Sequence, residues 1–213
     1  MNKRMLGLNG PKVSASGQGY MGMSDLYGPA DRSESIATIH NAIDEGITLF
    51  DTGDFYGMGQ NELLIKEALR GRKRKNILLS VKFGALRDPA GNWIGIDGRP
   101  QAVNDFRKYS PRFSGENLDR NLSLVETLRT TAEAKNATVA QLAINWVLSR
   151  GQDIVPLVGA RHRARLSEAL GALELDLTLK DLSDIEGSIP EDAAAGTRYP
   201  EQQMAHLDRE SGA

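Results

Sequence analysis

The sequence predicts an α/β fold with a parallel sheet covered by helices, and two observations support this. A short strand that runs into a glycine-rich loop at 13–24 and strands at 47–51 and 77–82 alternate with two segments of helical periodicity. The second and third strands are almost entirely apolar, which is typical of parallel strands buried on both faces. Strands that alternate with helices along the chain favour a layered α/β domain.

Two helices are expected between these strands. Asp31 is a good N-cap residue and Glu34 follows three residues later, which predicts a capping box, and Gly46 is a plausible stop. The second helix is expected over about 60–70, where apolar residues recur on one side. The predicted apolar stripe of that helix consists of Leu63, Leu64, Ala68 and Leu69.

Residues 84–115 have no clear periodicity, which is uncommon inside a compact domain and typical of a functional or mobile loop. The elements expected after it are a helix at 116–135, a helix at 139–150, a strand at 153–158, a helix to about Leu170 and, opened by a second capping box at Thr178 and Asp181, a helix to about Ser188. The composition after Pro190 is rich in Ala, Gly and charge. One domain is therefore expected over 1–190, followed by a disordered tail at 191–213.

Composition excludes several classes of protein. The 213 residues carry a net charge of -2 with mixed signs, so we expect no nucleic-acid partner and no anionic membrane partner. The chain has no cysteine, and its three histidines are far apart in sequence, so no metal site is expected. No run approaches the ~18 apolar residues of a membrane span, and a soluble, cytoplasmic protein is expected.

The segment Gly17-Gln18-Gly19-Tyr20-Met21-Gly22 matches the G-x-G-x-x-G pattern of dinucleotide-binding loops. In that fold the loop opens a helix at once, so that the helix N-terminus binds the pyrophosphate. Here the next helix is expected only near Asp31. The pattern therefore does not favour a Rossmann fold.

A carboxylate, a phenol and an amine are expected at the carboxyl ends of two neighbouring strands. Asp51 ends one predicted strand, Tyr56 follows in the next loop, and Lys82 ends the next strand. In α/β barrels the residues at these strand ends point into the site. An ammonium beside the phenol is expected to lower the tyrosine pKa, so that Tyr56 can donate a proton to a developing alkoxide.

Each of these residues also has a plain structural interpretation: Asp51 as a turn cap, Tyr56 as a packed ring and Lys82 as an exposed strand end. For each residue taken singly, the structural and the catalytic interpretation are about equally well supported. The spacing of the three residues and their placement at strand ends together favour the catalytic one. A third feature, 159–168, follows a strand and begins a helix with three arginines. It is either an anion site at a helix N-terminus or a solvated basic face, and spacing alone does not choose between them.

These segments together resemble the aldo-keto reductase family. The resemblance rests on six stretches: 13–24, 50–57, 80–84, 111–117, 141–148 and 154–161. It implies a (β/α)8 barrel of the TIM-barrel type and NADPH as cofactor. It also implies that Asp51, Tyr56 and Lys82 are three of four catalytic residues, with Tyr56 as the general acid.

The resemblance implies a set of cofactor-binding residues as well. They are Gly22, Met23, Asp51, Leu157, Gly159, Arg161, Arg165 and Glu168. Within this set, Arg161 and Arg165 are expected near the 2′-phosphate and Glu168 near the adenine. The NADPH preference depends on the two arginines.

The barrel is incomplete when it is compared with the family. The sequence passes from Val103, near the start of the third barrel helix, to Asn104, which resembles the segment after the seventh strand. Strands four to seven, the catalytic histidine and the nicotinamide contacts of the family are missing. The remaining strands, eight, one, two and three, are neighbours in the closed barrel, so the remnant is a half-barrel.

An open four-stranded sheet has two bare edges and an uncovered apolar face, which is costly in water. Two half-barrels forming a homodimer would remove this cost. The alternative is that residues are missing from the sequence between Val103 and Asn104.

The function expected is NADPH-dependent reduction of a small-molecule aldehyde or ketone to an alcohol. The first alternative is a catalytically impaired NADPH-binding or interaction protein that retains the half-barrel. The second alternative is a deletion product without a function of its own.

Overall fold

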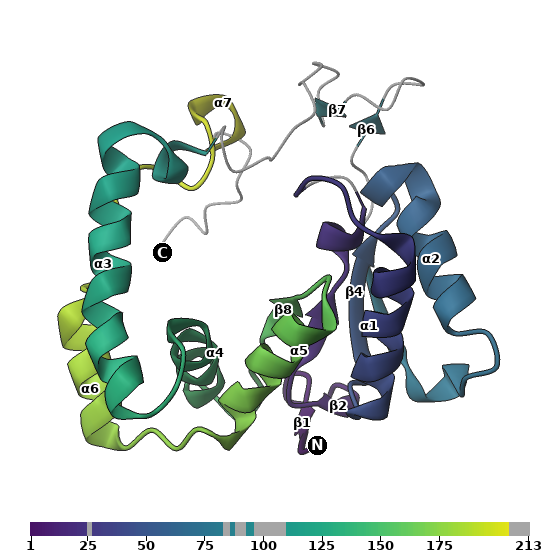
Figure 1. Ribbon diagram of the computed structural model, residues 1–213, viewed down its shortest axis with the longest axis horizontal. Coiled ribbons are helices and arrows are strands. Elements are labelled where there is room, and N and C mark those ends of the chain that lie inside the picture. The colour runs from purple at the N-terminus through teal and green to yellow at the C-terminus, as the bar shows by residue number, and fades with distance from the viewer. Residues whose placement is uncertain (25–26, 83–85, 88–92, 96–109, 205–213) are drawn as a thin grey trace. The chain divides into compact units, whose positions relative to one another are not determined.

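The computed structural model describes residues 1–24, 27–82, 86–87, 93–95 and 110–204. The chain forms two compact units (Figure 1). The first unit comprises Met1–Asn104 and Ala140–Asp176, and the second comprises Asp105–Val139 and Leu177–Ala213. The single domain expected over 1–190 stays a prediction. The expected junction at Val103 and Asn104 lies outside the described residues.

A four-stranded parallel sheet lies at the centre of the first unit. Its strands are β3 (Gly17–Gly19), β4 (Leu49–Gly53), β5 (Leu78–Lys82) and β8 (Leu157–Gly159). Their order is β5-β4-β3-β8, and every neighbouring pair is parallel. The predicted α/β fold with a parallel sheet is confirmed, and the expected neighbourhood of strands eight, one, two and three is present as β8, β3, β4 and β5.

Two predicted strands differ in their bounds. The strand expected at 153–158 begins only at Leu157, because Pro156 has no N–H to add to a ladder. The strand expected from residue 13 is divided into β2 (Lys12–Ser14) and β3. β2 pairs antiparallel with β1 (Lys3–Met5), and only β3 enters the parallel sheet.

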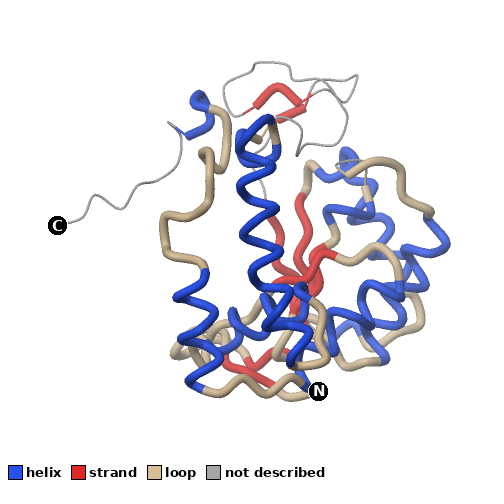
Figure 2. Tube along the Cα trace, turned by 60° about the vertical axis from the view of Figure 1, so that its left-hand side comes forward, coloured by secondary structure: helices blue, strands red, loops and turns tan. Residues whose placement is uncertain are grey.

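Four helices accompany the sheet: α1 (Arg32–Asp44), α2 (Gln60–Ala68), α4 (Val139–Ser149) and α5 (Arg163–Leu170). α1 packs against both α2 and α5. The Gln141 side chain of α4 donates a hydrogen bond to the Glu168 carbonyl of α5 at 2.8 Å. Figure 2 shows the strands grouped together with helices beside them. The helices therefore follow one another in the order α2, α1, α5 and α4 (Figure 1).

The start of α1 confirms half of its predicted capping box. The Asp31 carboxylate accepts a hydrogen bond from the Glu34 N–H at 2.6 Å, as expected of an N-cap. The reciprocal bond does not form, because the Glu34 carboxylate is bonded to the Arg163 guanidinium at 3.0 Å. A partner from α5 thus takes the carboxylate that the capping box would have used.

The core of the first unit lies between the sheet and its helices. Ile39 of α1, Phe50 of β4 and Leu166 of α5 are completely buried there. The predicted stripe of α2 is wrong at Leu63, whose side chain is 50% exposed. Ile65 takes its place in the core, because it lies on the same face as the other buried residues of the helix.

The predicted loop at 84–115 contains short elements. β6 (Leu86–Arg87) and β7 (Trp93–Gly95) pair antiparallel, and a 3-10 turn covers Pro111–Phe113. Pairs this short leave no periodic signal in a window of helical length, so sequence patterns miss them. Residues 88–92 and 96–109, between these elements, lie outside the described residues.

The second unit is built on α3 (Gly115–Ala134) and α6 (Leu179–Ser188), which pack together. The apolar residues at helical spacing in α3 do not form a buried face: Leu122 is 51% and Val125 is 39% exposed, and only Ala132 is buried. Within the second unit, α6 covers only part of the α3 surface.

The segment expected to be a disordered tail makes contacts as far as α7 (Glu201–Met204). The Ser110 hydroxyl donates to the Arg198 carbonyl at 2.9 Å, and the Asn121 side chain bonds both to the N–H and to the carbonyl of Ala195. The segment 191–204 is therefore hydrogen-bonded to other parts of the second unit, which its composition does not predict. Residues 205–213 lie outside the described residues. No helix in the part of the chain that the structure describes is long and apolar enough to cross a bilayer.

The capping box at the start of α6 is confirmed. The Thr178 hydroxyl accepts from the Asp181 N–H at 3.2 Å, and the Asp181 carboxylate accepts from the Thr178 N–H at 2.7 Å. The same carboxylate accepts from Lys135 of α3 at 2.6 Å. The hydrogen bonds from Lys135 and then from Thr178 lower the pKa of Asp181 from 3.8 to about 2.

We expect Asp181→Asn to lower the melting temperature at neutral pH. Because the folded pKa is depressed, this stabilisation is present above pH 3.8 and is lost as the pH falls through about 2. The difference in melting temperature between wild type and Asp181→Asn should therefore shrink below pH 4, as measured by circular dichroism. Asp184→Asn, an exposed aspartate on the same helix, is the matched control, and a pH-independent difference would contradict the assignment.

Candidate active site

Asp51 and Lys82 meet at the carboxyl ends of β4 and β5. The register pairs Asp51 with Ser80 and Gly53 with Lys82. Because side chains alternate along a strand, Asp51, Ser80 and Lys82 share one face of the sheet. The Lys82 ammonium donates to Asp51 Oδ1 in a salt bridge, and the Ser80 hydroxyl donates to Asp51 Oδ2 at 3.1 Å. Both oxygens of the carboxylate are thus held.

Sequence reasoning missed Ser80. The signal that identifies it is its position two residues before Lys82 in the same strand, which places both on one face. Its hydroxyl fixes the orientation of the Asp51 carboxylate, which is 10% exposed, whereas Lys82 is 48% exposed. A buried carboxylate therefore anchors an ammonium that still reaches the surface.

Tyr56 lies beside this pair. It begins a 3-10 turn (Tyr56–Gly59), its ring is buried, and the Lys82 nitrogen lies 5.7 Å from the ring centroid. Phe55 packs edge-on against it at 4.7 Å between centroids. The sequence-predicted residues Asp51, Tyr56 and Lys82 are therefore brought together by the fold.

The backbone after Tyr56 turns sharply. Gly57 has a positive φ of 56°, and a Cβ built there would lie 3.1 Å from the Ser24 Cβ. Met58 follows with a φ of 53°, an uncommon conformation for a residue with a side chain. This left-handed turn reverses the chain directly into α2, and it holds Tyr56 at the end of β4.

Burial raises the pKa of Tyr56, whereas the charge of Lys82 and a hydrogen bond with it lower that pKa. The net shift is upward, so the expected lowering of the Tyr56 pKa is wrong: the lysine acts in the expected direction, but burial outweighs it. Partial burial lowers the pKa of Lys82, but its hydrogen bond with Asp51 and the charges of Tyr56 and Asp51 raise it to a net upward shift. At neutral pH the site therefore presents a protonated phenol and a charged ammonium.

A buried network of polar side chains supports the loops around this cluster. Asn61 of α2 is completely buried; its amide donates to the Tyr20 carbonyl at 2.9 Å and to the Ser24 hydroxyl at 2.7 Å. The Thr52 hydroxyl donates to Asn61 Oδ1 at 2.6 Å. Asn61 thereby joins α2, β4 and the loop after β3. Sequence reasoning missed it, although an asparagine at a core-facing position of α2 is a usable signal.

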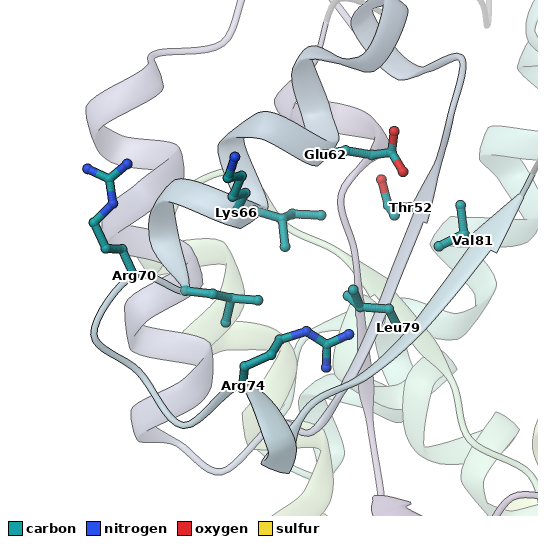
Figure 3. A pocket seen from close by; sticks show the side chains of 9 residues that line it. Thr52, Glu62, Lys66, Arg70, Arg74, Leu79 and Val81 are labelled. Atoms are coloured by element: carbon teal, nitrogen blue, oxygen red, sulfur yellow. The ribbon is translucent and has the colours of Figure 1, made fainter.

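A cavity of about 410 Å³ lies away from this cluster. Thr52 of β4 and Leu79 and Val81 of β5 line it from the sheet, so it is on the opposite face from Asp51 and Lys82. Ile65 and Lys66 of α2 line its other side (Figure 3). This cavity is therefore not the space in which Tyr56 would meet a substrate.

Of the residues expected to bind a cofactor, Gly159 lies at the same end of the sheet as Asp51, whereas Leu157 begins β8 opposite Gly17. Gly19 of β3 pairs with Asp51 on one side and with Gly159 on the other, which places those two residues at one level. A Cβ at Gly159 would meet nothing within 4 Å, so the space above this strand end is open. Leu157 is 49% exposed, whereas the Met23 side chain is buried in the core. Gly22 is half-buried beside Met23 in a 3-10 turn (Met21–Met23).

The arginines at the start of α5 all have partners. The Arg161 guanidinium donates to the carbonyls of Tyr27, Gly28 and Pro29 at 3.1, 3.4 and 3.2 Å. Arg165 pairs with Glu168 at 2.7 Å, and its side chain is 73% exposed.

A carboxylate already binds at the first turn of α5. The Arg163 N–H and guanidinium both donate to the Glu34 carboxylate, at 3.0 Å from the N–H. The hydrogen bonds from Arg163 lower the pKa of Glu34. This contact favours the anion-site interpretation of the segment over a freely solvated basic face.

The histidines do not join the cluster within the described part of the chain. His40 Nε2 bonds with the Ala68 carbonyl at 2.9 Å, and His162 is the N-cap residue of α5. His206 lies outside the described residues. Among those that are described, no group of three His, Cys, Asp or Glu side chains is arranged to hold a metal ion.

The sequence model of the aldo/keto reductase family matches residues 17–119 and 96–190. The chain belongs to this family. Aldo-keto reductases are oxidoreductases, and this membership establishes the general class of the protein. The two matched segments overlap at 96–119, which is the region in which the expected junction lies.

Known relatives align over most of their length. The chain is 25% identical to a probable aldo-keto reductase 1 of Glycine max, covering 91% of this chain and 90% of the relative. It is 21% identical to the aldo-keto reductase yakc of Schizosaccharomyces pombe, whose name specifies NADP(+), covering 88% and 92%. The soybean alignment extends over 313 positions, 100 more than the 213 residues of this chain. A stretch of that relative of at least this size therefore has no counterpart here.

Solved structures of aldo-keto reductases resemble this fold. A glycerol dehydrogenase from Gluconobacter oxydans superposes with a TM-score of 0.68 at 15% identity, covering 99% of each chain. A thermostable aldo-keto reductase in complex with epalrestat gives 0.61 at 17%, covering 88% of this chain and 100% of that chain. The fold is thus of the TIM-barrel type, represented here by a parallel sheet of four strands and its helices.

Proposed function

We propose that this chain reduces an aldehyde or ketone to an alcohol with NADPH, and that Tyr56 is the general acid. The observation that carries the proposal is the Lys82–Asp51 salt bridge beside the buried phenol of Tyr56. Burial raises the Tyr56 pKa, so the phenol is protonated at neutral pH, and the charge and hydrogen bond of Lys82 lower that pKa and favour release of the proton.

Each residue of the cluster has a distinct task in this proposal. Tyr56 donates its proton to the carbonyl oxygen as negative charge develops there. Lys82 stabilises the phenolate that is left behind, because its charge and hydrogen bond both favour the ionised phenol. Asp51 holds the ammonium in place, and Ser80 orients Asp51.

The residues at the other end of the proposed site fit a phosphorylated dinucleotide. Arg165 is exposed, and its pairing with Glu168 is a surface ion pair that a phosphate can replace at little cost. Arg161 is held in one orientation by three carbonyls, and Gly159 leaves open space at the sheet end. Gly22, Met23 and Leu157 complete the proposed cofactor residues. The cofactor, when bound, supplies the hydride that reaches the carbonyl carbon.

A catalytically impaired NADPH-binding protein is the second candidate. It is favoured by the at least 100 positions of the soybean relative that have no counterpart here, and by the absence of a histidine beside Tyr56 within the described residues. Poorer orientation of the substrate would reduce turnover without removing the phosphate contacts.

Two measurements on the purified full chain separate these candidates. NADPH fluorescence titration reports binding, and the decrease of NADPH absorbance with a panel of aldehydes and ketones reports turnover. Binding with carbonyl-dependent turnover supports the reductase, and binding without turnover supports the impaired protein. Absence of both contradicts the two candidates together.

The preference for NADPH is expected to depend on Arg165. We expect Arg165→Gln to weaken NADPH binding by roughly tenfold and to leave NADH binding unchanged, since one charge-assisted contact contributes ~1.5 kcal/mol or more. Arg120→Gln on α3 is the matched control, because it removes the same group from an exposed position far along the chain. Equal weakening of both cofactors would contradict a 2′-phosphate contact.

A further inference from the structure

The sheet of the first unit ends in two outer strands, β5 and β8. In the part of the chain that the structure describes, each has a neighbour on one side only, so the other edge offers backbone N–H and C=O groups. The face that carries Asp51 is also poorly covered: Leu78 of β5 is 36% exposed and Leu157 of β8 is 49% exposed. Parallel sheets are rarely left with an open apolar face, so this one is expected to have a cover.

The described helices of the first unit are not distributed evenly over the four strands: the β8 edge of the sheet has one more helix than the β5 edge. α5 follows β8, and α4 lies beyond α5, on the side away from α1 (Figure 1). At the β5 edge of the sheet, a cavity of about 410 Å³ lies between β5 and α2. Ile65, Leu69 and Leu79 are among its apolar lining residues. Figure 3 shows Leu79 together with the charged Lys66 and Arg74, which also line the cavity. The β8 edge of the sheet thus carries one more helix than the β5 edge. The β5 edge has a cavity in which a helix could pack.

We propose that two copies of this chain close into one eight-stranded barrel, with β5 of each copy paired with β8 of the other. A two-fold axis along the strands keeps all strands parallel and forms both junctions at once. Eight strands is also the number at which side chains just fill the interior of a barrel. In this arrangement α4 of one copy covers the cavity beside β5 of the other, so every junction between strands carries a helix.

The size of the proposed contact is sufficient for a stable dimer. Each copy contributes the five residues of β5, the three of β8, the eleven of α4 and seven further residues that line the cavity. Without Leu142 and Leu148 of α4, which are buried within one copy, about 24 residues on each side remain, and a standard interface of ~1,600 Å² has roughly 20–30 on each side. α4 also suits this role, since its sequence is largely apolar and only Leu142 and Leu148 are buried within one copy.

The closed barrel has a consequence for the candidate active site. Because all eight strands run in the same direction, the carboxyl ends of both copies of β4 and β5 lie at one end of the barrel. Two clusters of Asp51, Tyr56 and Lys82 then share that end. The proposed dimer does not depend on the proposed reductase function. If the chain proves not to be a dimer, the reductase function is still tested separately by measuring turnover.

Sedimentation equilibrium of the full chain tests the proposal directly. The wild type should have twice the mass of the chain at micromolar concentration. Val81→Lys places a charge in the cavity beside β5, and it should raise the dimer dissociation constant at least tenfold with an unchanged circular dichroism spectrum. Leu63→Lys makes the same type of change at an exposed position of α2 outside the cavity, and it should remain dimeric. A well-folded wild-type monomer, or an assembly larger than a dimer, overturns the proposal.

Hydrogen exchange provides a readout that does not depend on one variant folding. Backbone amides of 78–82 and 157–159 should gain protection as protein concentration rises, whereas those of α3 should not change. Leu78→Glu, a second variant on the other face of β5, should lose the concentration-dependent protection as Val81→Lys does. Protection of both strands that is independent of concentration, with an unchanged mass in both variants, overturns the proposed pairing.

Discussion

Replacing Tyr56 by phenylalanine is expected to reduce carbonyl-dependent NADPH oxidation by about 10²–10⁴-fold, the usual contribution of a positioned general acid. The ring and its packing against Phe55 are retained, so the change removes only the hydroxyl. Because burial keeps this phenol protonated, the loss should be seen across the neutral range. Steady-state absorbance measurements with the best carbonyl substrate of the wild type provide the readout.

The control separates a chemical role from a structural one. NADPH binding of Tyr56→Phe should match that of the wild type, and its melting temperature should fall only slightly, because the hydroxyl bonds with Lys82 but contributes nothing to the sheet. Tyr199→Phe removes the same group from a residue of the second unit and should retain full activity. Unchanged turnover in Tyr56→Phe would refute the general-acid assignment.

Replacing Asn61 by alanine is expected to lower the free energy of unfolding by ~3 kcal/mol, the largest effect on stability that we expect for a single substitution. The change removes three hydrogen bonds and leaves the Thr52 hydroxyl and the Tyr20 carbonyl without this partner in a buried place. It also leaves a small void in the core. Urea unfolding at one fixed protein concentration measures the change, because an oligomer would otherwise alter the apparent stability.

Leu63→Ala is the matched control for this experiment. It lies on the same helix but is half exposed, so its effect should remain within about 0.5 kcal/mol. Any loss of activity in Asn61→Ala should follow from displacement of the loop that carries Ser24, since Asn61 does not contact Tyr56 in the hydrogen bonds described above. A stability loss below 1 kcal/mol would show that this network is not a principal support of the fold.

The longer helices and the four strands of the central sheet could be predicted because their signals are local. Asp31 and Thr178 mark helix starts by accepting bonds from residues three positions on, and the structure contains both bonds. The cluster of Asp51, Tyr56 and Lys82 was predictable for a similar reason: strand ends and alternation decide which side chains meet. Ser80 follows from the same alternation and was missed only because its chemistry is less distinctive.

Other features depended on contacts between distant residues. The Glu34 carboxylate leaves its own helix start for Arg163, which lies 129 positions away in the chain. The direction of the Tyr56 pKa depended on how deeply the ring is buried, and the sequence suggested the opposite sign. Neither outcome has a periodic or compositional signature.

By itself, the sequence determined the resemblance to the family, the order of the longer helices and the central strands, and which polar residues stand at the strand ends, because these follow from motifs and short-range periodicity. Only the tertiary structure decided which partner each charge takes, which apolar stripes are covered and on which face of β5 the cavity lies. The physical reason is that burial and pairing depend on the surfaces that long-range packing brings together. The residue pattern of a segment indicates which side chains are apolar enough to be buried, but the packing of neighbouring elements determines which of them are buried.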